Sequence, residues 1–235
     1  MRFAFPGFLL CVCALLADSP AVAQDDPASL SGGFDLIELR TGDEGDAFIW
    51  DGTFSYGDST DQAMLVFQGG GALGGQIDEV QARLFYGRAS GGNIVLLAGV
   101  RKDFKPHPRD AHAAIGIQGQ IGSRLSWESY VFLSDAGRLT GEGQIIYQLP
   151  ITQRLYLEPR VAAGWSAQTI DVEAVRPGFT EAEATVRLRY RLTDKVNAYA
   201  GVVYEGLLGG TRALARSQGE AVTSTVAVVG FGFSL

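Results

Sequence analysis

The chain has 235 residues, carries a formal net charge of −7, and contains 31 glycines but only 8 prolines and 2 cysteines. An exported chain this acidic is a poor candidate for nucleic-acid binding, so no nucleic-acid partner is expected. After residue 23 no apolar run approaches the 18 residues that a transmembrane helix needs. A membrane location would therefore require a closed β-barrel, since only helices and barrels satisfy their backbone polar groups in lipid.

Residues 1–23 are predicted to be a cleaved signal peptide for export. Arg2 provides a positive start, residues 8–16 are apolar, and Ala21-Val22-Ala23 has the small-x-small pattern of a cleavage site. Cleavage after Ala23 would remove one charge of each sign, so the mature chain would keep the net charge of −7.

The two cysteines offer a rival interpretation, a lipoprotein signal ending at Cys11 or Cys13. The residues before them, Leu10 and Val12, are too large for the usual lipid-attachment box, and we favour the ordinary signal. Both cysteines would then leave with it, which excludes disulfides and thiolate metal sites from the mature chain.

We expect residues 24–33 to form a short periplasmic lead and residues 34–235 to form one β-barrel. Apolar and polar residues alternate with a period of two, as in half-buried strands. Within 180–192, for example, Val186 and Leu188 fall on one face and Arg187 and Arg189 on the other. About twelve such segments are predicted, near 34–41, 46–57, 62–70, 76–88, 93–103, 112–121, 125–134, 138–149, 153–166, 180–192, 196–206 and 222–235.

The length of these segments favours a membrane barrel over a soluble β-sheet protein. Strands of about ten residues cross a bilayer at a barrel's tilt, whereas soluble sheets use strands of about five or six. The predicted connections alternate between tight ones, such as 58–61 and 193–195, and long ones, such as 167–179 and 207–221. This alternation and the even strand number predict a transmembrane, antiparallel, up-and-down all-β barrel in a Gram-negative outer membrane, with both termini in the periplasm.

Aromatic residues and a glycine-rich run are the next features of the sequence. Aromatic residues are predicted to form girdles at the two membrane interfaces on the lipid-facing side: Trp50, Tyr56, Tyr86, Trp127, Trp165 and Tyr204. The glycine-rich run from Gly69 to Gly75 is no phosphate loop, because no Gly-Lys-Ser/Thr follows it, and we expect a flexible turn outside the barrel.

If the apolar face meets lipid, the opposite face lines a heavily charged lumen. The side chains expected to point inward are Glu38, Arg40, Asp51, Glu79, Arg83, Arg101, Asp103, Glu128, Arg138, Glu142, Glu158, Arg160, Arg187, Arg189 and Glu205. The simpler interpretation is that acids and guanidiniums pair across strands and stiffen the barrel. The alternative is that some acids form a cation path, although both signs are interspersed along the sequence.

Several segments together resemble the outer-membrane copper resistance protein B family. They are FDLIELRTGDEGDAFIWDG at 34–52 with YGD at 56–58, GVRKDF at 99–104, AIGIQG at 114–119, FLSD at 132–135, LPITQRLYLEPR at 149–160, RLRY at 187–190 and YAGVVYE at 199–205. The likeness extends over the whole mature chain in order. It implies an outer-membrane barrel that binds copper and contributes to copper tolerance by export or sequestration.

The sequence departs from that family in its copper ligands. Family members usually carry a Met- and His-rich segment before the barrel, but residues 24–33 contain neither residue. Thioethers select Cu(I) and imidazoles suit Cu(II), and the mature chain offers Met64, His107 and His112, so only a low capacity for copper is expected. Met64 and His112 are predicted near opposite rims, which disfavours a shared site. The candidate lumen-facing ligands are His112, Met64, Glu38, Asp51, Asp103 and Glu158.

Two other functions are weighed against copper handling. An enzyme is not expected, because no Gly-x-Ser-x-Gly or His-Glu-x-x-His pattern occurs and two histidines leave little choice of base. A general outer-membrane channel or structural barrel without metal specificity is the alternative that the poor ligand inventory favours. The expected partners are outer-membrane lipid, copper ions and a periplasmic copper-handling protein.

Overall fold

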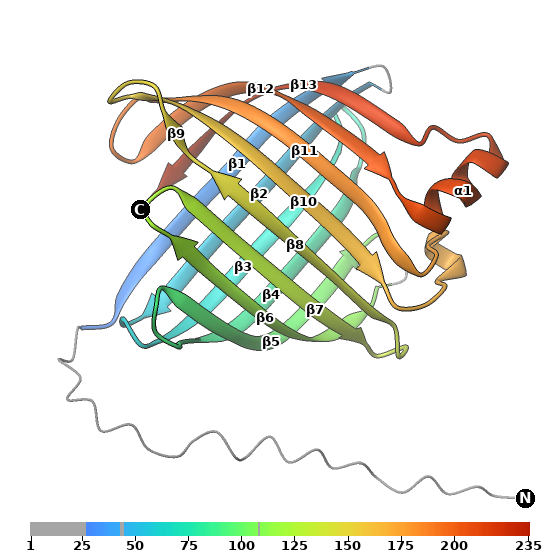
Figure 1. Cartoon of the computed structure of the whole chain (residues 1–235), viewed down its shortest axis with the longest axis horizontal. Coiled ribbons are helices and arrows are strands. Elements are labelled where there is room, and N and C mark those ends of the chain that lie inside the picture. The colour runs from blue at the N-terminus through green and yellow to red at the C-terminus, as the bar shows by residue number, and fades with distance from the viewer. Residues whose placement is uncertain (1–26, 43–44, 108) are drawn as a thin grey trace, which may run out of the picture.

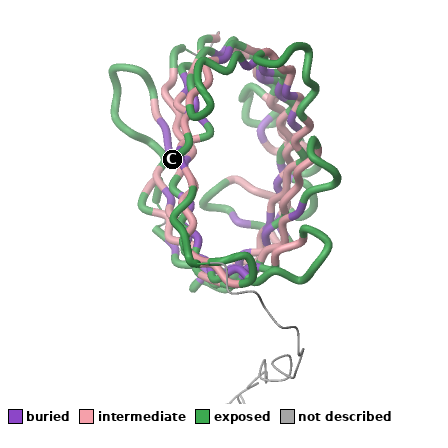
Figure 2. Tube along the Cα trace, turned by 90° about the vertical axis from the view of Figure 1, so that its left-hand side faces the viewer, coloured by how far each residue is buried: buried purple, intermediate pink, exposed green. Residues whose placement is uncertain are grey.

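A computed structural model describes residues 27–42, 45–107 and 109–235, and the predicted signal peptide with its cleavage site lies outside them. The described residues form a closed antiparallel barrel of twelve long strands (Figures 1 and 2). They are β1 Ser29–Gly42, β2 Gly45–Gly57, β3 Asp61–Ala72, β4 Ile77–Ala89, β5 Ile94–Lys105, β6 Ala111–Ile121, β7 Leu125–Ser134, β8 Leu139–Tyr147, β10 Leu155–Ser166, β11 Gly178–Arg191, β12 Val196–Leu207 and β13 Thr223–Ser234. The two-residue β9, Leu149–Pro150, continues β8 along β10.

Each strand pairs with its neighbours in the chain, and β1 pairs with β13 to close the barrel. Closure leaves no open sheet edge, as a bilayer requires. The predicted up-and-down barrel is therefore confirmed. Among the described residues, no helix has the length and apolar character to cross a membrane.

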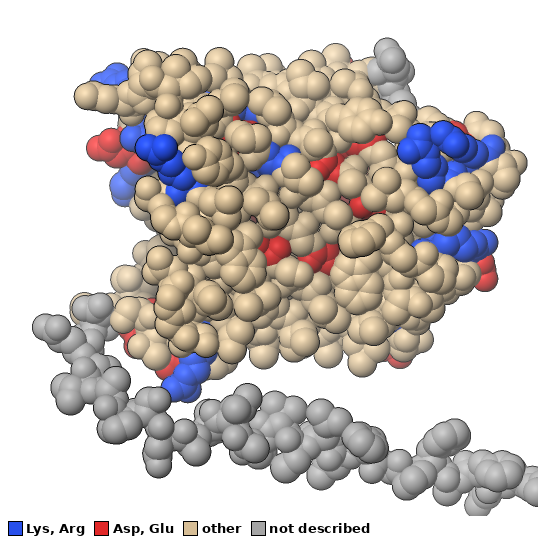
Figure 3. All heavy atoms as spheres, viewed as in Figure 1, with Lys and Arg blue, Asp and Glu red and all other residues tan. Residues whose placement is uncertain are grey.

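The two faces of each strand invert the pattern of a soluble protein. Apolar side chains such as Ile115 and Leu84 are 62% and 55% exposed on the outside, whereas Glu38 and Arg187 are 0% exposed inside. On the face drawn in Figure 3, neutral residues cover most of the middle, and Lys and Arg gather mainly toward the two ends. This distribution fits an apolar band in lipid around a polar lumen.

The two ends of the barrel differ in their connections. One end has tight turns, such as the one after β2, where the backbone N–H groups of Asp61 and Thr60 donate to the Asp58 carboxylate at 2.8 Å and hold the pKa of Asp58 below its ordinary value. The other end carries the 3₁₀ helix η1, Asp171–Glu173, and the helix α1, Gly209–Gln218 (Figure 1). We assign the tight-turn end to the periplasm.

The observed elements differ from those predicted from the sequence at three places. First, β1 begins at Ser29 instead of residue 34, because Ser29–Gly33, predicted as lead, pairs with β2. Second, Gly69–Gly71 belongs to β3 and not to a turn. Third, α1 occupies the predicted loop at 207–221, and it ends at Gly219, whose left-handed φ of 78° suits a helix C-cap.

The glycines of β3 have a packing reason that recurs elsewhere in the barrel. Each of the three tryptophans lies opposite a glycine of an adjacent strand: Trp50 opposite Gly69, Trp127 opposite Gly119 and Trp165 opposite Gly141. A Cβ at these glycines would come within 2.3, 2.8 and 2.5 Å of the indole ring, respectively. The indoles thus cover glycine backbone on the lipid-facing wall.

We predict that Gly69→Ala destabilises the barrel by about 1–3 kcal/mol, the usual cost of overpacking. The added Cβ would lie 2.3 Å from Trp50 Cζ2 and 2.6 Å from the backbone oxygen of Glu79. Urea unfolding in detergent, followed by tryptophan fluorescence, measures the change. The control is Gly206→Ala in β12, where the nearest atom is 3.5 Å away. Equal stability of the two variants would contradict the packing argument.

Candidate functional site

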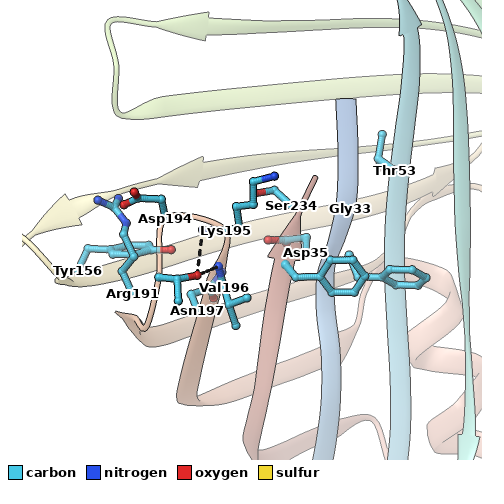
Figure 4. A pocket seen from close by; sticks show the side chains of 13 residues that line it. Gly33, Asp35, Thr53, Tyr156, Arg191, Asp194, Lys195, Val196, Asn197 and Ser234 are labelled. Atoms are coloured by element: carbon cyan, nitrogen blue, oxygen red, sulfur yellow. Dashed lines mark hydrogen bonds between the residues drawn. The ribbon is translucent and has the colours of Figure 1, made fainter. Parts of the chain in front are cut away.

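The lumen contains two cavities that share no lining residue. The outer chamber, about 900 Å³, reaches from the external ends of the strands to the middle of the barrel, where Leu36, Asp51 and Arg160 line it. The inner pocket, about 350 Å³, lies at the periplasmic end and is lined by Asp35, Tyr156, Arg191, Lys195 and Asn197 among others (Figure 4). The two cavities are therefore separated by side chains in the middle of the lumen.

The outer chamber is strongly acidic. Its lining includes nine carboxylates and three guanidiniums: Asp46, Asp51, Asp78, Glu79, Glu128, Glu142, Glu181, Glu183 and Glu205, with Arg40, Arg83 and Arg160. The sequence alternates the two signs, but the fold segregates them. Acids far apart in the chain come together on this side, so the structure shows an excess of negative charge that the sequence did not predict.

The three arginines of the outer chamber already form ion pairs with carboxylates. Arg83 Nη1 lies 2.6 Å from Glu142 Oε1, Arg160 Nη2 lies 2.6 Å from Asp35 Oδ2, and Arg40 Nε lies 2.9 Å from Glu38 Oε1. Among the described residues, six of the chamber's carboxylates form no ion pair: Asp46, Asp51, Asp78, Glu79, Glu128 and Glu181. Neutral groups hold some of them, as the Gln68 amide holds Asp51 at 2.8 Å.

Below the chamber, ion pairs fill the lumen. Arg187 of β11 donates to Glu38 of β1 through Nε at 2.8 Å and Nη2 at 3.2 Å, and both side chains are fully buried. Glu158 of β10 accepts Arg189 at 3.0 Å and Arg160 at 3.3 Å. The predicted pairing of lumen charges across strands is confirmed here. It also means that Glu38 and Glu158, two candidate copper ligands, already bind guanidiniums.

Asp35 joins this network through a β-bulge. It is the extra residue between Phe34 and Leu36 where the register of β1 with β2 shifts. Its carboxylate lies 2.6 Å from Arg160 Nη2 and 3.1 Å from Arg189 Nη2. Strict alternation would direct Asp35 toward lipid, so the sequence pattern did not predict that its side chain lies in the lumen. The preceding Gly32-Gly33 was the available signal for a bulge.

His112 and Asp103 form a separate pair near the external end. The His112 Nε2 lies 2.8 Å from Asp103 Oδ2, and Asp103 also accepts Arg101 Nε at 2.7 Å. Arg101 Nη1 in turn lies 3.9 Å from Glu142, which lines the outer chamber. His112 is 9% exposed, and its Nδ1 is buried with no hydrogen-bond partner in the described part of the chain.

Met64 occupies different surroundings. It is 3% exposed in the apolar cluster on the inner wall, with Val66, Phe85, Leu97, Ala114, Tyr130 and Phe132. The Phe132 ring meets the His112 ring edge-on at 6.2 Å and carries the Arg101 guanidinium at 4.9 Å. Within residues 27–42, 45–107 and 109–235, no group of three or more His, Cys, Asp or Glu side chains is assembled to hold a metal ion.

His107 and Arg138 both lie in connections at the external end of the barrel. His107 is exposed in the connection between β5 and β6. Arg138, predicted to line the lumen, lies in the turn before β8, where it pairs with Asp110 and with Glu173 of η1, the latter at 2.8 Å. Arg138 therefore ties external loops together.

The sequence is similar to known proteins of one family. The family model described as copper resistance protein B precursor (CopB) matches residues 30–234. A copper resistance protein B homolog of Pseudomonas syringae pv. tomato is 30% identical over 83% of this chain, and copper resistance protein B of Escherichia coli is 32% identical over 79%. These matches span 66% and 62% of the two relatives' own lengths, respectively.

Solved structures are similar in fold. The NanC porin has a TM-score of 0.55 at 12% identity, covering 88% of this chain and all of that one. The KdgM porin has a TM-score of 0.50 at 10% identity, covering 87% of this chain and 99% of that one. At such low identity the likeness concerns the barrel alone.

We predict that Arg187→Leu costs about 3–5 kcal/mol of unfolding free energy, because it breaks a fully buried ion pair and leaves the Glu38 carboxylate with Arg40 Nε, at 2.9 Å, as its remaining charged partner. The double variant Glu38→Leu/Arg187→Leu removes both charges and should recover most of that loss. Urea unfolding measures both.

The matched control for this prediction is Arg88→Leu. Arg88 faces Asp61 at 3.9 Å, and the two side chains are 55% and 42% exposed, so the loss should stay below about 1 kcal/mol. If the double variant were as unstable as Arg187→Leu, the charge left on Glu38 by the broken pair would not be the cause.

Proposed function

Because the chain belongs to the copper resistance protein B family, we propose that this outer-membrane barrel binds copper ions in its lumen and contributes to copper homeostasis and resistance by exporting or sequestering them. Family membership supports the role in copper resistance. The proposal assigns the barrel no catalytic role. A periplasmic copper-handling protein would exchange copper with it.

The acidic outer chamber is the observation that carries this proposal. Nine carboxylates face three arginines that are already paired, so the chamber has a negative potential toward mobile ions. A cleft lined by one sign of charge and walled by low-dielectric material concentrates ions of the opposite sign. Copper in either oxidation state is a cation. Carboxylates such as Asp51 would hold Cu(II) transiently, which suits passage better than storage.

His112 is the residue best placed to add specificity for copper. In the tautomer that donates Nε2–H to Asp103, the buried Nδ1 carries a free lone pair. A carboxylate that accepts one ring N–H and leaves the other nitrogen for the metal is the usual arrangement around metal-binding histidines. The contacts from Asp103 through Arg101 to Glu142 connect this histidine with the chamber wall.

Met64 would serve only Cu(I), because its thioether is a soft ligand within an apolar cluster. With one such methionine and one buried histidine, the barrel would hold few copper ions at a time. The alternative function is a general channel or structural barrel without metal specificity. The porin-like fold and the few methionines and histidines in the sequence favour that alternative.

We predict that the mature barrel in detergent binds Cu(II) more tightly than Zn(II) in calorimetric titrations, and that His112→Ala weakens Cu(II) binding by at least about tenfold. Loss of the Asp103 support, in Asp103→Asn, should cost about 10–100-fold. Electron paramagnetic resonance of bound Cu(II) would report nitrogen coupling in the wild type and its loss in His112→Ala.

The matched control is His107→Ala, which removes the exposed loop histidine and should leave Cu(II) affinity unchanged. Equal affinities for copper and zinc, unaltered in His112→Ala, would contradict copper binding at this histidine and favour the general channel.

A further inference from the structure

We propose that the ion pair between Asp35 and Arg160 is the movable barrier between the outer chamber and the inner pocket, and that Asp51 is the alternative partner of Arg160 when the barrier opens. The inference deepens the proposed function and rests on it in one respect, that copper is the natural passenger. The barrier itself would oppose the passage of any small cation through the lumen.

The position of the Asp35–Arg160 pair supports its role as the barrier between the two cavities. Arg160 lines the outer chamber and Asp35 lines the inner pocket, and their side chains meet at 2.6 Å. No residue lines both cavities, so this contact joins the wall of one to the wall of the other. Arg160 also places a positive charge at the floor of an otherwise acidic chamber, where it opposes the further passage of a cation.

The pair differs from its neighbours in how easily it can separate. The Glu38–Arg187 pair is 0% exposed on both sides, whereas the Asp35 side chain is 47% exposed and Arg160 is 6% exposed. Arg189, 3.1 Å from Asp35, and water in the inner pocket can stabilise the Asp35 carboxylate when Arg160 leaves it, so this pair can separate at a lower cost than a pair buried on both sides. Asp35 also belongs to a β-bulge just after Gly32, whose φ of 133° suits glycine, so the backbone here is irregular. The Asp35–Arg160 pair is thus more accessible to water than the Glu38–Arg187 and Glu158–Arg189 pairs beside it.

Asp51 offers Arg160 a further carboxylate, besides Asp35 at 2.6 Å and Glu158 at 3.3 Å. It lies on β2 directly opposite Leu36, the residue next to Asp35, and like Arg160 it lines the outer chamber. Its partner is the neutral Gln68 amide, and it forms no ion pair in the described part of the chain. A guanidinium that moves from Asp35 to Asp51 therefore keeps a charged partner throughout. Two discrete arrangements of similar energy are what a switch requires.

Conductance of the full mature barrel in planar bilayers with potassium chloride on both sides tests the proposal. Asp35→Asn removes the partner of the closed arrangement and should raise the mean conductance several-fold. Arg160→Gln removes the barrier charge and should do the same, which keeps the test open if one variant fails to fold. Asp51→Asn removes the partner of the open arrangement and should lower the conductance below that of the wild type.

The matched control is Asp78→Asn, which takes one carboxylate from the same chamber near its external rim and should change conductance less than Asp51→Asn does. Wild-type conductance in both Asp35→Asn and Arg160→Gln would overturn the barrier. Increased conductance in Asp51→Asn would overturn the exchange between the two carboxylates. Because potassium and chloride carry the current, failure here leaves copper binding untouched, and a barrel that binds no copper can still show this barrier.

Discussion

A barrel in lipid offers its charged side chains only one polar environment, the lumen, and the rest of this structure follows from that constraint. Period-two alternation sends most of the charges on the strands inward, where they must neutralise one another or remain hydrated. In the periplasmic half they neutralise one another, as Arg187 does with Glu38. This pairing fills the barrel and separates the two cavities.

The same pairing explains why the outer chamber is acidic. The inner network takes up Arg187, Arg189 and one end of Arg160, so few guanidiniums are left to compensate the carboxylates nearer the outside. Structural stability in one half of the lumen and an attractive potential for cations in the other thus come from one distribution of charge. His112, held by Asp103 behind the chamber wall, adds a nitrogen that carboxylates alone lack.

Much of this could be predicted from the sequence, because alternation and strand length depend on each residue's own character. The barrel, the inward arginines other than Arg138, and the outward tyrosines were predicted correctly. Departures arose where pairing overrides local pattern. The bulge at Asp35 changes which face a residue joins, and Gly69 is in a strand because an indole from β2 covers it. The segregation of acids depends on which strands face one another across the lumen, which alternation does not encode.

Copper binding inside the barrel can be measured by copper-edge anomalous diffraction. Crystals of the mature barrel grown with a copper salt would be measured above and below the copper edge. An anomalous peak is expected within bonding distance of His112 Nδ1, with weaker peaks among the carboxylates of the outer chamber. Peaks confined to the outer surface of the barrel, with none in the lumen, would contradict it.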